Sequence, residues 1–122
     1  MASISSYRDL LVWQASVDLA TSCYKLTAGF PSGELYGMTS QIRRASVSVA
    51  ANIAEGHGRD DTGHFIQFLR VAQGSLKELE THVVICGRVG LLDEQTVGAL
   101  QEQCDEIGRM LRSLIRTLEA KA

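Results

Sequence analysis

Between positions 34 and 59 the sequence carries polar side chains that could bind an anion or a phosphate backbone. These residues are Glu34, Arg43, Arg44, Asn52, Glu55 and Arg59. One interpretation is a ligand patch, since arginine side chains neutralise phosphates. The other is a network of ion pairs and hydrogen bonds that fixes the register between helices or subunits. We favour the network, because acids and bases occur together and can satisfy one another.

Residues suited to metal or covalent chemistry are present, but their spacing does not match a working site. A di-metal bundle needs Glu-x-x-His motifs, and the sequence has none among His57, His64 and His82. No serine lies in a G-x-S-x-G turn, and the cysteines fall on apolar helical faces, where a thiol is inert (Cys23, Cys86 and Cys104). Gly56-His57-Gly58 lacks the remaining residues of a phosphate-binding loop. We therefore predict no enzymatic activity, no metal site and no cofactor.

The elements that position these residues are four predicted helices in one domain, residues 1–122. Capping residues and glycine or proline stops place the helices at about 6–28, 34–56, 61–89 and 93–119. Ser6 with Asp9 forms the first capping signal, and Asp93 caps the last helix. The connections are short, so neighbouring helices must run antiparallel. The expected fold is all-α, an antiparallel up-down-up-down four-helix bundle.

Apolar residues spaced three and four apart predict which face of each helix enters the core. In the first helix this seam is expected at Leu10, Trp13, Val17, Ala20 and Tyr24. In the third helix it is expected at Phe65, Leu69, Ala72, Leu76, Leu79, Val83 and Cys86. A glycine in the middle of the third helix, Gly74, costs about 1 kcal/mol relative to alanine.

The second helix is the one that predicts self-association. Residues 45–54 are small or apolar around the whole circumference, and a helix without a polar face should be buried on every side. A second copy of the chain is the simplest cover, since most soluble oligomers contain identical subunits. The expected interface residues are Leu11, Trp13, Val47, Ala50, Ala51 and Ala54.

Charge and cysteine usage limit the expected location and partners. The net charge is −2, so no overall positive field attracts nucleic acid or an anionic membrane. Three unclustered cysteines suit a reducing compartment. The sequence shows no secretory signal and no apolar stretch of the ~20 residues that span a bilayer. We expect a cytoplasmic protein without membrane association.

Several motifs resemble those of a known family. They are Tyr-Arg-Asp-Leu-Leu-Val-Trp-Gln-Ala (7–15), Phe-Pro-Ser-Gly-Glu-Leu-Tyr-Gly-Met (30–38), Gln-Ile-Arg-Arg-Ala (41–45), Asn-Ile-Ala-Glu-Gly-His-Gly-Arg (52–59), Phe-Ile-Gln-Phe-Leu (65–69) and Ala-Gln-Gly-Ser-Leu-Lys-Glu-Leu-Glu (72–80). This is the four helix bundle protein family. It includes proteins encoded by intervening sequences in large-subunit ribosomal RNA genes. The accessory protein of diversity-generating retroelements is a relative.

The resemblance implies a four-helix bundle that assembles into a ring-like homopentamer, and it implies no assigned activity. The retroelement accessory protein binds a reverse transcriptase and nucleic acid through a basic surface, whereas this chain is slightly acidic. The favoured function is a non-enzymatic, homo-oligomeric interaction or scaffold protein in the bacterial cytosol. Its expected partner is its own copies, and another protein or nucleic acid is left open as a further partner. The alternative is an RNA- or DNA-binding accessory factor that acts through Arg43, Arg44 and Arg59.

Overall fold

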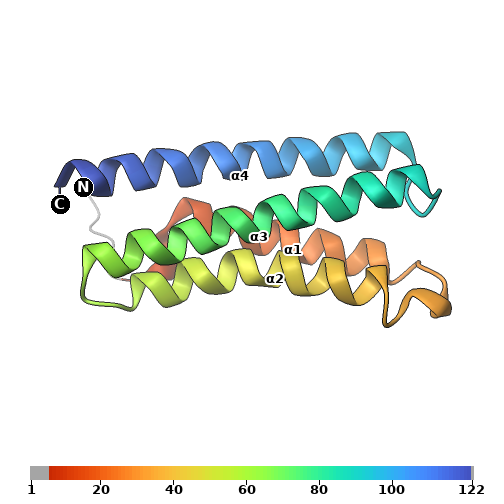
Figure 1. Cartoon of the computed structure of the whole chain (residues 1–122), viewed down its shortest axis with the longest axis horizontal. Coiled ribbons are helices and arrows are strands. Elements are labelled where there is room, and N and C mark those ends of the chain that lie inside the picture. The colour runs from red at the N-terminus through yellow and green to blue at the C-terminus, as the bar shows by residue number, and fades with distance from the viewer. Residues whose placement is uncertain (1–5, 122) are drawn as a thin grey trace.

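The computed structural model describes residues 6–121. Four long helices, α1 (Leu11–Thr27), α2 (Met38–His57), α3 (Thr62–Arg88) and α4 (Glu94–Lys121), lie side by side with short 3₁₀ turns η1 (Tyr7–Asp9) and η2 (Ser32–Glu34) before α1 and α2. The described residues contain no β-strand. Consecutive helices run in opposite directions (Figure 1). Each helix contacts the next, and α1 contacts α4, which closes the bundle; the α2–α3 contact is the most extensive.

The start of α1 differs from the expected start at residue 6. Ser6 and Asp9 do form the predicted reciprocal cap, since the Arg8 amide donates to Ser6 Oγ over 3.2 Å and the Ser6 amide donates to Asp9 Oδ2 over 3.2 Å. This cap closes only the three-residue turn η1. Leu10 then adopts an extended backbone, with ψ 122°, so the α-helix begins one residue later.

The second helix also begins later than expected, at Met38 instead of about residue 34. Glu34 ends the turn η2, and its Oε1 accepts a hydrogen bond from the Met38 amide over 3.1 Å. The carboxylate therefore satisfies one of the free amides at the start of α2, where negative charge is favourable.

The starts of α3 and α4 are capped by aspartates. Asp61 accepts from the amides of Gly63 and His64, and Asp93 Oδ1 accepts from the Thr96 amide over 2.7 Å. Between these helices Gly90 has φ +83°, a left-handed conformation that glycine adopts without steric cost. The Leu91 amide then bonds back to the Cys86 carbonyl, which terminates α3.

The core confirms the predicted seam of α3 and corrects that of α1 beyond Leu10. From Leu69 to Cys86 every predicted seam residue of α3 is buried, and Phe65 is half-buried against the core. In α1 the buried face is instead Val12, Ser16, Leu19, Cys23 and Thr27. Of the predicted seam, Leu10 is buried at 7%. Trp13, Val17 and Ala20 lie one position around the helix and are half-buried, with Trp13 packed against the edge of the core, and Tyr24 is 46% exposed.

Candidate functional site

An apolar groove runs along the surface between α1 and α2. One wall is formed by the α1 residues that the sequence pattern placed in the core, and the other by the outer face of α2. The groove has a volume of about 450 Å³ and is lined by Trp13, Val17, Ala20, Thr21, Tyr24, Val47, Ala50 and Ala51. None of these lining residues carries a charge. Exposed apolar patches of this kind mark interaction sites.

A second hollow continues this face toward the start of α2. It has a volume of about 570 Å³ and shares Tyr24 and Val47 with the first groove. Its other lining residues are Leu35, Tyr36, Thr39, Ser40, Arg43, Arg44 and Ser48. The two hollows therefore form one continuous surface, which we call the α1–α2 face.

Most of the expected interface residues lie on this face. Trp13, Val47 and Ala51 line the first groove, and Val47 and Ala51 are exposed. Ala50 also borders the groove, but it is only 8% exposed and packs mainly inside its own subunit. Ala54 is half-buried one turn further along α2.

Leu11, by contrast, belongs to a different surface from Trp13. It is 70% exposed and lines a separate groove of about 550 Å³ between the start of α1 and α4, beside Met110 and Leu114. Two positions along a helix turn the side chain through roughly 200°. The two residues therefore cannot contribute to one flat interface.

The first two arginines of the expected basic patch make contacts within the subunit. Arg43 Nε donates to Thr27 Oγ1 over 2.9 Å, and its guanidinium carbon lies 4.6 Å from the centre of the Tyr24 ring. Arg44 Nη2 pairs with Glu78 Oε2 on α3 over 3.3 Å, while the Arg44 side chain stays 66% exposed. Arg43 thus joins α2 to α1, and Arg44 joins α2 to α3.

The third arginine lies at the opposite end of α2. Arg59 Nη2 pairs with Glu55 Oε1 over 3.1 Å, and its guanidinium carbon lies 5.2 Å from the centre of the Phe68 ring. It follows Arg44 by fifteen positions, which along a helix corresponds to roughly 20 Å. The structure does not bring Arg59 together with Arg43 and Arg44 into one patch. Nucleic-acid binding through these residues stays a prediction.

The remaining polar residues also serve local contacts. Glu34 caps α2, as described above. Asn52 Nδ2 donates to the Ser48 carbonyl over 2.8 Å, and the Ser48 hydroxyl lies 2.7 Å from the Ser75 hydroxyl on α3. Of these bonds, the one between Ser48 and Ser75 joins α2 to α3, and the bond from Asn52 lies within α2. The six polar residues are therefore distributed along α2 and its two ends as separate pairings.

The three thiols are buried in the folded chain and therefore poorly reactive. Burial raises the pKa of Cys23 to about 11 and that of Cys104 to about 12, so neither thiol forms the reactive thiolate near neutral pH. Within residues 6–121, no three His, Cys, Asp or Glu side chains come close enough together to hold a metal ion. In the same part of the chain, no helix combines the length and apolarity needed to cross a membrane.

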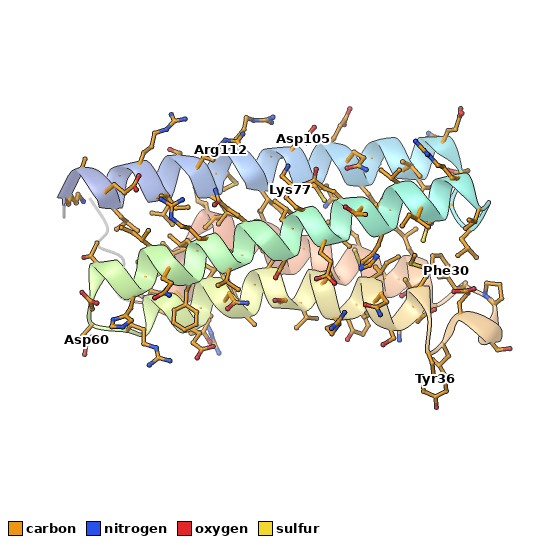
Figure 2. All side chains as sticks on the ribbon, viewed as in Figure 1. Phe30, Tyr36, Asp60, Lys77, Asp105 and Arg112 are labelled. Carbon is orange, nitrogen blue, oxygen red and sulfur yellow. The ribbon has the colours of Figure 1, made fainter. Side chains whose placement is uncertain are left out.

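The sequence interpretation missed one prominent residue, Tyr36. It lies in the turn between η2 and α2, and its side chain is 93% exposed, beside Leu35 at 50%. The sequence feature that could have indicated it is a large aromatic residue directly before Gly37, in a segment between two helices, where no helical face would bury its side chain. Figure 2 shows the Tyr36 side chain projecting away from the bundle.

Comparison with known proteins connects this geometry to a family. The family model described as 23S rRNA-intervening sequence protein matches residues 8–113. No curated protein is similar. A solved structure with the same fold is that of a protein of unknown function from the S23 ribosomal protein family of Bacteroides thetaiotaomicron VPI-5482. It has a TM-score of 0.77 and 24% sequence identity, over 86% of this chain and 98% of that one. Since the family model spans most of the sequence, the chain belongs to the 23S rRNA-intervening sequence protein family.

Proposed function

We propose that this chain is a non-enzymatic scaffold protein of the cytoplasm that assembles with copies of itself through the α1–α2 face. The observation that supports this proposal most directly is a second apolar stripe on α1, which lines the groove. Trp13, Val17 and Tyr24 repeat with heptad spacing, yet the fully buried residues of α1 lie on the neighbouring face of the helix. A heptad stripe is the pattern with which helices bury themselves against partners. Here it lies beside Val47 and Ala51, two exposed apolar residues of α2.

A second copy of the chain is the proposed partner because the residues that line the groove between α1 and α2 carry no charge. A partner of strongly acidic or basic character would find no complementary groups in the groove, whereas an equally apolar surface would be buried without losing hydrated charges. Most soluble oligomers are built from identical subunits in closed symmetry. The stoichiometry that we propose, five copies in a ring, rests on the family resemblance alone.

The contacts of the arginines favour this function over nucleic-acid binding. A phosphate-binding patch needs several accessible cations close together, since affinity grows with the number of phosphates neutralised. Arg43 is held by Thr27 and Tyr24, and Arg59 lies at the other end of α2 beside Glu55. The buried thiols, with their raised pKa values, likewise offer no nucleophile for catalysis.

Light scattering coupled to size-exclusion chromatography measures the mass of the eluted protein and so tests the proposal. At micromolar concentration we expect a mass several times that of one chain. Ala51→Glu places a charge in the exposed wall of the groove and should yield single chains with unchanged helical content by circular dichroism. The control is Gln67→Glu, which adds the same charge at an exposed position of α3 that lines none of the grooves described above. A wild-type protein with the mass of one chain would contradict the proposal.

A further inference from the structure

Tyr36 lies in a hydrogen-bonded turn, although its side chain is almost wholly exposed. The turn beneath it is closed by hydrogen bonds from the Leu35 amide to the Ser32 carbonyl, 3.1 Å, and from the Gly37 amide to the Glu34 carbonyl, 2.9 Å. The Glu34 carboxylate then fixes the first residue of α2. The aromatic side chain thus projects from a turn whose backbone is fixed by hydrogen bonds (Figure 2). Aromatic residues presented in this way serve as interface anchors.

The groove between α1 and α2 has the chemistry to receive such a side chain. Its walls carry the aromatic rings of Trp13 and Tyr24, with the small residues Ala20 and Ala51 leaving space between them. Buried tyrosine hydroxyls need a hydrogen-bond partner. Thr21 supplies one at the groove, because its hydroxyl donates to the Val17 carbonyl over 2.8 Å and its oxygen can still accept.

The area of the face indicates that a flat contact alone would be small and that a projecting residue would enlarge it. From Met38 to Ala51 the face is about 20 Å long at 1.5 Å per residue, and two packed helices are roughly 20 Å wide. This amounts to about 400 Å² in projection, against the ~800 Å² that each partner buries in a stable interface. A large aromatic side chain adds ~150–250 Å², and Leu35 beside it is half exposed.

On the basis of the proposed self-assembly, we propose that Tyr36 of one copy inserts into the groove between α1 and α2 of the next copy. The anchor and the groove lie at different places on one chain, at the start of α2 and along its middle. Each subunit therefore has one anchor to give and one groove to fill. In a ring, every subunit gives Tyr36 to one neighbour and receives that of the other.

Complementation between two variants tests this contact. Tyr36→Ala removes the anchor and leaves the groove; Ala51→Glu blocks the groove and leaves the anchor. We expect each variant alone to elute as single chains, with affinity weakened about 30-fold or more, as for an anchor residue. An equimolar mixture should form a complex of one chain of each kind, because one junction is intact. Tyr36→Phe, which keeps the ring, should assemble nearly as the wild type does.

The lone tryptophan gives a second readout, since Trp13 lines the groove. Its emission should shift to shorter wavelength when the mixture forms, and its quenching by acrylamide should fall. If Tyr36→Ala assembles like the wild type while Ala51→Glu does not, the insertion is overturned and the proposed self-assembly stands. If the variants stay separate on mixing, the groove is not where Tyr36 binds. A wild-type protein that is itself a single chain overturns both proposals.

Discussion

Arg43 donates a hydrogen bond from Nε to the hydroxyl oxygen of Thr27 over 2.9 Å, which ties α2 to the last turn of α1. Its Nη2 also reaches the Tyr24 carbonyl at 3.4 Å. Thr27 is buried, and its own hydroxyl donates to the Cys23 carbonyl over 2.7 Å. The guanidinium therefore sits at the carboxyl end of a helix, where a cation is favoured. These contacts lie within one subunit, as the favoured interpretation of the polar residues as an ion-pair and hydrogen-bond network expects.

Replacing Arg43 by alanine should lower the free energy of unfolding by about 1–3 kcal/mol, because the buried Thr27 oxygen and the end of α1 lose their partner. Arg44→Ala is the matched comparison. Its ion pair with Glu78 is exposed, so its loss should cost less than about 1 kcal/mol. Urea unfolding followed by circular dichroism measures both. Equal losses in the two variants would contradict the capping role of Arg43.

Gly56 allows α2 and α3 to approach closely, and a methyl group there should be costly. A Cβ at this position would lie 2.6 Å from Phe68 Cβ and 3.1 Å from Phe65 Cδ1. Gly56→Ala should therefore destabilise the protein by about 1–3 kcal/mol through overpacking. Gly98→Ala has no atom within 4 Å of its new methyl group and should stabilise α4 by about 0.5–1 kcal/mol. Urea midpoints that move in the same direction for both variants would contradict this reading of Gly56.

The sequence predicted the four helices and the α3 seam because local signals there agree. In α3 the residues from Leu69 to Cys86 offer one unbroken heptad stripe, and Asp61 marks the start. In α1, two neighbouring stripes compete. The core takes the one that contains Ser16 and Thr27, whose hydroxyls bond to carbonyls four residues earlier and so tolerate burial. The stripe that contains Trp13, Val17 and Tyr24 is the more hydrophobic of the two. A prediction from hydrophobic spacing therefore assigned that stripe to the core, although it lies toward the surface.

The candidate site was predicted in its α2 half, but in α1 only Trp13 was assigned to it, while Val17, Ala20 and Tyr24 were placed in the core. The small residues around Ala51 indicated an uncovered surface, and the structure places Ala51 and Val47 on that surface. It also shows that Ala45, Val49 and Ile53 are covered within the subunit, so less of α2 needs a partner than the composition suggested. The role of Tyr36 depends on the path of a turn, which composition does not specify.

The cap at the start of α4 should make stability fall in acid. Hydrogen bonds from the Thr96 amide, and secondarily from its side chain, lower the pKa of Asp93. A carboxyl whose folded pKa lies below the unfolded value of about 3.9 stabilises the fold above that pH and ceases to do so as the pH falls through the folded pKa. Asp93→Ala should lower the melting temperature at neutral pH and reduce its decline below about pH 4. Thermal scans between about pH 6 and 2.5 measure this; an unchanged acid profile would contradict it.

The buried thiols should make the free energy of unfolding fall as the pH rises into the alkaline range. The carboxylate of Asp93, in contrast, makes it fall as the pH is lowered. Burial raises the pKa of Cys23 to about 11, while an unfolded thiol ionises near 8.5. Below pH ~8.5 both states keep the proton. Between pH ~8.5 and 11 only the unfolded chain releases the Cys23 proton, so the free energy of unfolding falls by about 3 kcal/mol over that window. Urea unfolding at stepped pH measures the slope. Cys23→Ala, although less stable overall, should show a flatter slope, and a slope as steep as that of the wild type would mean that Cys23 ionises in the folded protein.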